Sequence, residues 1–268
     1  MLNLATTQAF VFDMDGVLYR GLEVIPGARE FLADLTAHAI PYRLLTNNAS
    51  LTQAQFAAKL ATMGIDVPAA NIMTSSVATA EYLSQVAPPG AQILPIGLDG
   101  VRAALQDRGF VLVNDRPADY VVVGIDWTAT YDTLKRASLA IRDGARFIGT
   151  NGDKTFPSPE GIIPGNGSLL AFLEAATDVK PTIIGKPEIG IFTQTVHSMG
   201  THPTATAMVG DRLDTDIEGA ARAGLRSIFL LSGVHNRDDL AKSGLTADLV
   251  FDDIAALRAA WRAAWGLD

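Results

Sequence analysis

The segment that decides the fold reads AFVFDMDGVLYRG and spans residues 9–21. Its first four residues are apolar, aromatic or β-branched, which is typical of a strand buried on both faces of a parallel sheet. Two carboxylates, Asp13 and Asp15, follow this run. Ligands of open α/β sheets bind beyond the carboxyl ends of the strands. The segment therefore predicts a sheet edge at which acidic side chains carry out chemistry.

The composition predicts a globular protein that does not bind polyanions. The chain has 268 residues, 48% of them hydrophobic, enough for one large or two ordinary domains. A formal charge of -8 disfavours nucleic acid and anionic membranes, and no stretch approaches the ~20 apolar residues of a membrane span. The absence of cysteine excludes thiolate metal sites and fits a reducing compartment. Because the start also lacks a signal-peptide pattern, we expect a cytoplasmic protein.

Strand-like and helix-like patterns alternate along the chain, as in βαβ units. An interior stretch has an alternation of its own, and it begins after a Pro-Pro-Gly linker at residues 88–90. We therefore predict an α/β core with a doubly wound parallel sheet, formed by residues 1–87 and 181–268. Residues 88–180 are predicted to form a smaller inserted α/β domain of βαβαβα order.

Three further apolar runs lead to polar residues that can bind phosphate or metal ions. YRLLT ends in Thr46, TIIG leads to Lys186, and AMVG leads to Asp211. If all four runs belong to one sheet, these side chains converge with Asp13 and Asp15 at one edge. Two carboxylates 4 Å apart repel by about 4 kcal/mol at an effective dielectric of 20, so a cation is needed. Oxygen ligands without cysteine favour Mg²⁺.

The chain resembles the haloacid dehalogenase (HAD) superfamily in four ordered strings, DMDGVLYRG, TNNAS, GKP and GDRLDTDIEGA. The resemblance is strongest to its NagD-like, 4-nitrophenylphosphatase-type branch. It extends over nearly the whole chain, because TSSVATAEYL, TNGDKTFPSPEGIIPGNGSL and AGLRSIFLLSG also resemble that branch. The resemblance implies a Rossmann-like core, an inserted cap domain, and Mg²⁺-dependent hydrolysis of phosphomonoesters.

By this resemblance Asp13 is the nucleophile and Asp15 is the general acid and base. A carboxylate can attack phosphorus to form an aspartyl-phosphate, which divides one difficult displacement into two easier ones. Residues i and i+2 of an extended chain share a side, so Asp15 can protonate the leaving oxygen and later deprotonate the attacking water. Hydrolytic dehalogenases of the superfamily lack an acid at the position of Asp15, which favours a phosphatase.

The other motif residues are expected, by the same resemblance, to bind phosphate and metal. The phosphoryl-binding set is Thr46, Asn47, Asn48 and Lys186. The Mg²⁺ set is Asp13, Asp15 and Asp211, with Asp216 supporting the ion more through water than directly. A metal ion and a lysine stabilise the charge that spreads over the transferring phosphoryl oxygens. Asp214 is omitted, because a helix cap explains it as well as a metal contact does.

The spacing of the motifs places the inserted domain after the second motif. One helix and one strand already fill the interval between Asp13 and Thr46. The interval from Thr46 to Lys186 leaves roughly 100 residues after one βαβ unit of ~30 residues. The resemblance makes this insertion a type-two cap. Within it, Asn151 and Asp153 of TNGDKTF are equally consistent with a substrate contact and with a turn.

Four positions are expected to be structural. Ser50 is a candidate N-cap for a helix that begins at Leu51. Trp261 and Trp265 lie four residues apart in a terminal helical stretch, which predicts core packing. His235 follows a strand end and is most simply a surface or structural residue, with a role at the sheet edge as the alternative.

Three alternative functions are consistent with parts of the sequence. A dinucleotide-binding oxidoreductase would use GNGSLL at residues 165–170, but Leu170 occupies the place of the third glycine. A non-catalytic binding module would lack the reactive positions that are present here. A phosphotransferase would use the same nucleophile with an alcohol as acceptor. The predicted partner is a small phosphorylated metabolite such as a nucleotide or sugar phosphate, with no nucleic acid or membrane, and a homodimer is left open.

Overall fold

The computed structural model describes residues 3–158 and 160–267. The chain groups into two compact units. The first, here called the core unit, comprises Met1–Thr46, Ala57–Met73 and Lys186–Asp268, and the second, the cap unit, comprises Asn47–Phe56 and Thr74–Gly185. The domain boundaries expected near residues 88 and 180 stay a prediction. No helix in the described part of the chain is long and apolar enough to span a membrane.

The core unit is built on a six-stranded sheet in the order β15-β14-β13-β1-β4-β5. These strands are, in that order, Leu249–Phe251, Arg226–Leu230, Thr206–Gly210, Ala9–Phe12, Tyr42–Thr46 and Ile72–Thr74. β1 pairs in parallel with β13 and with β4, and β14 pairs in parallel with β13 and with β15. All four residues of β1 are buried. The predicted strand, buried on both faces of a parallel sheet, is confirmed.

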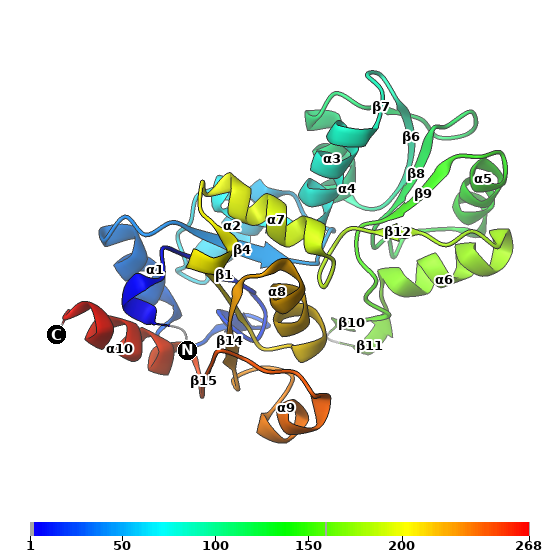
Figure 1. Ribbon diagram of the computed structural model, residues 1–268. Coiled ribbons are helices and arrows are strands. Elements are labelled where there is room, and N and C mark those ends of the chain that lie inside the picture. The colour runs from blue at the N-terminus through cyan, green and yellow to red at the C-terminus, as the bar shows by residue number, and fades with distance from the viewer. Residues whose placement is uncertain (1–2, 159, 268) are drawn as a thin grey trace. The chain divides into compact units, whose positions relative to one another are not determined.

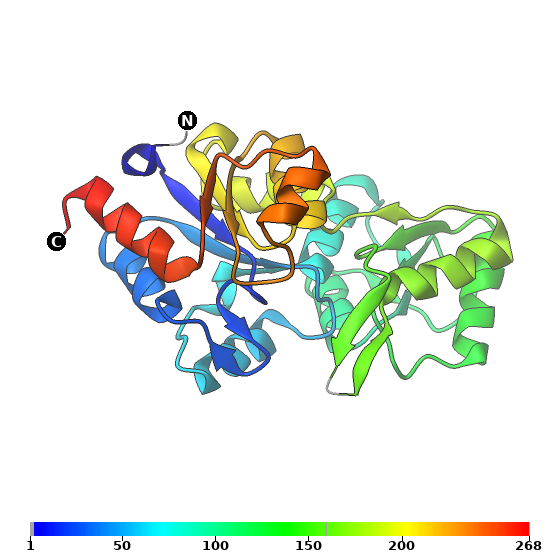
Figure 2. The same ribbon diagram turned by 90° about the horizontal axis from the view of Figure 1, so that it is seen from below.

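Helices cover both faces of this sheet, which makes the core doubly wound as predicted. They are α1 (Ala28–Ala37), α2 (Gln53–Thr62), α7 (Ile189–Ser198), α8 (Glu218–Ala223), α9 (Arg237–Ser243) and α10 (Ile254–Trp265). Figures 1 and 2 show α7 and α8, in yellow and gold, on the opposite face of the sheet from the blue α1.

An aromatic cluster fixes α1 and α10 against β1. The Phe31 ring of α1 lies 5.5 Å from Phe10 and 5.7 Å from Phe12, measured between ring centroids. Trp261 of α10 lies 5.6 Å from Phe31 and is fully buried. Because large rings remove much apolar surface from water, these contacts account for a major share of the stability of this face. The expected core position of Trp261 is confirmed.

Short elements complete the core unit. The hairpin strands β2 (Tyr19–Arg20) and β3 (Glu23–Val24) follow the first motif and pair antiparallel. The 3₁₀ turns are η1 (Leu4–Thr6), η2 (Ala69–Asn71) and η3 (Pro203–Ala205), and η4 (Leu213–Ile217) is a π-helical turn.

The cap unit has a five-stranded sheet in the order β12-β9-β8-β6-β7. The strands are β6 (Gln92–Ile96), β7 (Val111–Leu112), β8 (Tyr120–Val123), β9 (Arg146–Gly149) and β12 (Thr182–Ile183), and the helices are α3 (Ser75–Val86), α4 (Asp99–Asp107), α5 (Tyr131–Arg142) and α6 (Asn166–Thr177). An antiparallel hairpin of β10 (Thr155–Ser158) and β11 (Gly161–Pro164) is added between β9 and α6. The predicted alternation of strands and helices is present, and β7 and the hairpin were not predicted.

One run expected in the core sheet belongs to the cap sheet instead. Thr182 of β12 pairs with Ile148 of β9, in parallel. The prediction that TIIG joins the core sheet is therefore wrong, because a short apolar run indicates a strand but not its neighbour.

The expected cap of α2 is also wrong. This helix begins at Gln53, and the Thr52 hydroxyl accepts from the Gln55 N–H at 3.1 Å. The Ser50 hydroxyl instead donates to Asn48 Oδ1 at 2.6 Å. Thr52 therefore performs the capping role that we had expected of Ser50.

Candidate active site

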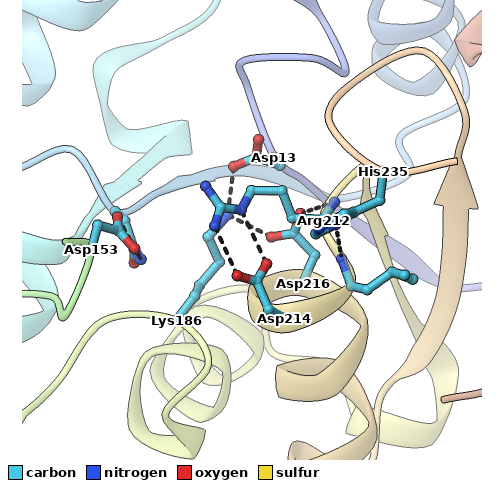
Figure 3. Close-up of polar contacts among 9 residues, drawn as sticks. Asp13, Asp153, Lys186, Arg212, Asp214, Asp216 and His235 are labelled. Carbon is cyan, nitrogen blue, oxygen red and sulfur yellow. Dashed lines mark hydrogen bonds and ion pairs between the residues drawn. The ribbon is translucent and has the colours of Figure 1, made fainter. Parts of the chain in front are cut away.

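Asp13 follows β1 directly and contacts a buried lysine. The Lys186 Nζ donates to Asp13 Oδ1 at 2.5 Å and to Asp216 Oδ1 at 2.7 Å (Figure 3). The exposed fraction is 4% for Lys186 and 0% for Asp216. Ion pairs that are buried and hydrogen-bonded hold their groups in fixed orientations. Three segments far apart in the sequence therefore meet at one ammonium group.

Asp211, which follows β13, completes an acidic cluster. One carboxylate oxygen each from Asp13, Asp211 and Asp216 lies within 4.8 Å of the others. Asp211 Oδ2 accepts from the Val234 N–H at 2.7 Å. Asp211 Oδ1 is buried and has no hydrogen-bond partner among the described residues. A buried oxygen of this kind is expected to bind a ligand such as a metal ion or water.

Glycines make room for this carboxylate. A Cβ added to Gly233 would lie 1.8 Å from Asp211 Oδ2, and one added to Gly16 would lie 2.5 Å from the same oxygen. Both distances are far below van der Waals contact, so a side chain at either position would displace Asp211.

The π-helical turn η4 presents Asp216. The Arg212 N–H donates to Asp216 Oδ2 at 3.1 Å, so both oxygens of Asp216 are engaged. Such turns are rare and occur often at functional sites. Asp214 of the same turn points to the surface and pairs with the Arg212 side chain at 2.8 Å. This position agrees with its omission from the predicted metal set.

His235 supports the acidic segment without being part of the cluster. Its ring Nδ1 accepts from the Leu213 backbone N–H at 3.0 Å, and the His235 backbone N–H donates to the Asp211 carbonyl at 3.3 Å. The only sequence signal for this role was its place after a strand end.

The cluster contains more negative than positive charge. Burial, with a smaller contribution from Asp216 and Asp211, raises the pKa of Asp13 to about 8 against the opposing effect of Lys186. Burial, and then Asp216, raise the pKa of Asp211 to about 6. Burial by itself would lower the pKa of Lys186, but Asp13 and Asp216 outweigh it and raise that pKa. Three carboxylates around one ammonium therefore favour an additional cation.

The donor set fits a hard divalent cation. It offers only carboxylate oxygens, which Mg²⁺ prefers, and one of them, Asp211 Oδ1, is without a partner. Among residues 3–158 and 160–267, this is the group of three or more acidic or histidine side chains that could hold a metal ion. The side chain of Asp15, which we had included in the metal set, lies outside this group.

Asp15 lies two residues beyond Asp13 and forms an isolated backbone β-bridge with Tyr19. Asp15 is exposed by its surface area, yet the surrounding protein raises the pKa of its carboxyl group by desolvation, and Lys59 opposes this shift. The Lys59 Nζ lies 4.7 Å from the centre of the Tyr19 ring. A raised pKa suits a group that must donate a proton. Lys59 was not predicted, because a single lysine on a helix has no distinguishing pattern.

Thr46 ends β4, the neighbour of β1. Since Phe12 pairs with Leu44 in parallel, Asp13 and Thr46 both lie at the carboxyl end of adjacent strands. Asn47 and Asn48 come next and belong to the cap unit, where the Asn47 amide donates to Asp153 Oδ2 at 3.2 Å.

Known proteins match nearly the whole chain. Residues 10–111 match the family model for haloacid dehalogenase-like hydrolases, and residues 183–257 match a HAD-hydrolase-like model. An acid sugar phosphatase of Staphylococcus epidermidis is 38% identical over 247 residues, which is 92% of this chain and 95% of that protein. A 4-nitrophenylphosphatase from Thermotoga maritima has a TM-score of 0.91 at 34% identity, covering 97% of this chain and 99% of that one. NagD from E. coli K-12 has a TM-score of 0.87 at 33% identity, covering 92% and 97%.

Proposed function

The chain belongs to the haloacid dehalogenase-like hydrolase family, and we propose on this basis that it is a Mg²⁺-dependent phosphomonoester hydrolase acting through an aspartyl-phosphate. It is an enzyme of the phosphatase type, and its resemblance to NagD and to 4-nitrophenylphosphatases is confirmed. The observation that supports the proposal most is the buried Lys186 ammonium between Asp13 and Asp216, next to Asp211.

The proposed Mg²⁺ site uses the acidic cluster. Asp13 and Asp211 would hold the ion. Asp15, whose side chain lies outside the acidic cluster, stays a prediction as a further ligand. Asp216 would act more through water, because both of its oxygens already accept hydrogen bonds from the protein. When bound, the ion would neutralise charge on the phosphoryl oxygens and orient the ester.

Asp13 is the proposed nucleophile. Lys186 holds one of its carboxylate oxygens and so limits the rotation of the carboxylate. In the first step, an oxygen of Asp13 forms a bond to phosphorus while the bond from phosphorus to the leaving oxygen breaks. Asp15 gives its proton to that oxygen, and Thr46 and Lys186 donate hydrogen bonds to the phosphoryl oxygens.

The second step regenerates the enzyme. Water attacks the aspartyl-phosphate at phosphorus, and Asp15, now ionised, takes the proton of the water. The bond between Asp13 and phosphorus breaks, and inorganic phosphate leaves. The desolvation that raises the pKa of Asp15 supports both roles, because the group must hold a proton in one step and accept one in the next.

The proposed substrates are small phosphorylated metabolites. The names of the relatives, an acid sugar phosphatase and 4-nitrophenylphosphatases, make sugar phosphates the first class to test. The inserted cap domain, with its predicted boundaries at residues 88 and 180, is the proposed source of substrate selection. A cytoplasmic location remains part of this proposal, and the homodimer stays open.

Phosphate release over a panel of sugar phosphates, nucleoside monophosphates and 4-nitrophenyl phosphate tests the function. We expect Mg²⁺-dependent release by the parent protein and none by Asp13→Asn, while Asp143→Asn, at an exposed ion pair in the cap unit, matches the parent. Failure of the parent to release phosphate from any ester would refute the proposal. Added alcohols distinguish hydrolysis from phosphoryl transfer, since a transferase would form a new ester in place of inorganic phosphate.

A further inference from the structure

Thr46 and Lys186, which are proposed to donate hydrogen bonds to the phosphoryl oxygens, have neighbours in the chain that contact each other within the cap unit. Thr46 is followed by Asn47, and Lys186 is preceded by Gly185. A Cβ added to Gly185 would lie 2.6 Å from Asn47 Oδ1. Segments that are far apart in the sequence therefore come together directly beside Thr46 and Lys186.

Asn47 is held through both its main chain and its side chain. Its carbonyl oxygen accepts from Asn151 Nδ2 at 2.7 Å and from Ser75 Oγ at 2.5 Å. Its side-chain amide donates to Asp153 Oδ2 at 3.2 Å and Oδ1 at 3.3 Å. Thr46 is the last residue of β4, and one peptide bond joins it to Asn47. These contacts therefore restrict the direction in which the chain leaves β4 after Thr46.

The loop of residues 150–153, which contains Asn151 and Asp153, also holds Gly185. The Gly185 N–H donates to the Thr150 carbonyl at 2.9 Å. A Cβ at Gly185 would lie 2.6 Å from that carbonyl oxygen and 3.0 Å from the Asn151 Cβ. The backbone approach leaves no room for a side chain, so the position of residue 185, and of Lys186 after it, depends on Asn151 and its neighbours.

The first residues of α6 donate hydrogen bonds to the main chain of this loop. Asn166 Nδ2 donates to the Asn151 carbonyl at 2.7 Å, and the Gly167 N–H donates to the Asp153 carbonyl at 2.8 Å. A Cβ at Gly165 would lie 2.4 Å from the Asp153 carbonyl oxygen. The glycines that a dinucleotide site would have needed thus have a packing role here.

We propose that Asn151 and Asp153 are positioning residues which, through Asn47 and Gly185, set the placement of Thr46 and Lys186 for phosphoryl binding. We call Asn47, Asn151, Asp153 and Gly185 the phosphoryl junction. The inference rests on the proposed function and adds a role for cap residues in it. Asn151 is only 4% exposed, so its side chain is committed to the junction and is unavailable to a leaving group.

The phosphoryl junction acts on the part of the substrate that all phosphomonoesters share. Weakening it should therefore reduce the affinity for every ester, and for inorganic phosphate, by one common factor. Weakening a residue that contacts the leaving group would instead reduce the affinity for the different esters unequally and leave the affinity for inorganic phosphate unchanged.

The test compares Asp153→Ala with Asp153→Asn, which keeps an oxygen acceptor for the Asn47 amide. A misplacement of ~1 Å near a reacting group can reduce the rate about 10²-fold. In Asp153→Ala we therefore expect kcat/KM to fall, and KM and the phosphate Kd to rise, each by about 10- to 10²-fold. Asp153→Asn should recover most of this loss. Asn151→Asp is nearly isosteric but loses the donor to the Asn47 carbonyl, and it should show the same uniform loss.

Gly185→Ala gives a second route to the same prediction, because its methyl group would displace Asn47 or Thr150. Asp107→Ala, at an exposed position of α4, and Gly190→Ala, where a Cβ meets nothing within 4 Å, are the matched controls and should resemble the parent. Calorimetric titration with inorganic phosphate and Mg²⁺ gives Kd without turnover. Thermal unfolding of each variant confirms that it is folded.

Unequal losses among the esters, with an unchanged phosphate Kd, would overturn the inference and make Asp153 a specificity residue. Variants with the KM values and phosphate Kd of the parent would overturn it as well. A parent that binds phosphate but hydrolyses no ester would refute the proposed function alone, because the Kd comparison still tests the phosphoryl junction.

Discussion

Replacing Asp13 with asparagine is expected to abolish turnover and, in the absence of metal, to stabilise the fold. The Asp13–Lys186 attraction at 2.5 Å is about 6.6 kcal/mol at an effective dielectric of 20. The repulsion from Asp211 and from Asp216, at no more than 4.8 Å, is at least about 3.5 kcal/mol each on the same scale. The two repulsions together cancel the attraction, and desolvation adds a further cost of several kcal/mol for a buried carboxylate.

Asparagine keeps the shape of Asp13 and an oxygen acceptor for Lys186 but removes the charge. At pH 8 we expect the free energy of unfolding to rise by several kcal/mol, since each unit of pKa shift corresponds to about 1.4 kcal/mol, and the Tm to rise with it. The gain should depend on pH. The pKa of Asp13 is about 8 in the folded protein and 3.8 as a reference value. A carboxyl group whose pKa is raised by folding destabilises the protein increasingly between these two pH values. The advantage of Asp13→Asn should therefore grow from about pH 4 to about pH 8 and then level off.

Calorimetry in excess chelator, over this pH range, measures the stability, and phosphate release in Mg²⁺ measures the activity. Asp143→Asn, which removes a carboxylate that is 58% exposed, should change the free energy of unfolding by less than about 0.5 kcal/mol. A lower Tm for Asp13→Asn at pH 8 would show that the Asp13 charge stabilises the fold and would refute the charge balance. Turnover near that of the parent would exclude Asp13 as the nucleophile.

Other consequences concern the metal and the core. Chelation should abolish phosphate release and Mg²⁺ should restore it, whereas Ca²⁺ should inhibit because its larger and looser coordination misplaces the attacking carboxylate; full activity in excess chelator would contradict this. Gly233→Ala would displace Asp211 and should weaken Mg²⁺ binding in calorimetric titration by about tenfold or more, the loss expected when a metal ligand is misplaced. An unchanged Mg²⁺ Kd would show that the close approach of Gly233 does not position Asp211 for the metal. Burial raises the pKa of Asp34, but hydrogen bonds and charge from Arg258 and Arg262 outweigh it and lower that pKa. Asp34→Asn should therefore reduce stability at pH 7 by about 1–3 kcal/mol, with the difference lost as pH falls below about 4; a difference that persists in acid would contradict the ion pair.

The positions of the carboxylates proposed for catalysis could be predicted because they follow buried strands. A run such as AFVF favours an interior strand, and parallel strands deliver the residues after them to one edge. Asp13 and Asp211 lie where this reasoning puts them, one residue beyond β1 and β13. Lys186 reaches the same place by a route that was not predicted, because the run before it pairs in the cap sheet.

Side-chain partners distant in sequence could not be predicted. The Asn47–Asp153 hydrogen bond joins residues 106 positions apart, and each residue by itself fits a local turn. The contact of Lys59 with Tyr19 and the support that His235 gives to Leu213 depend in the same way on tertiary packing. Local patterns specify strands and turns, whereas these pairs arise only when separate elements meet.

The two carboxylates that bind Lys186 have different tasks in the proposed reaction. When Asp13 becomes an acyl phosphate, its carboxylate charge is lost, and the phosphoryl oxygens that Lys186 is proposed to bind take its place as an ionic partner of the ammonium group. Asp216 is fully buried and pairs with Lys186. In the proposed reaction it forms no bond to phosphorus, so it would keep the ammonium charged and oriented through both steps. Asp214 could not replace it, because Asp214 is exposed and pairs with Arg212. The sequence presents these two acids two residues apart with similar surroundings, and only the π-helical turn, by burying one and exposing the other, determines which of them keeps the lysine in place.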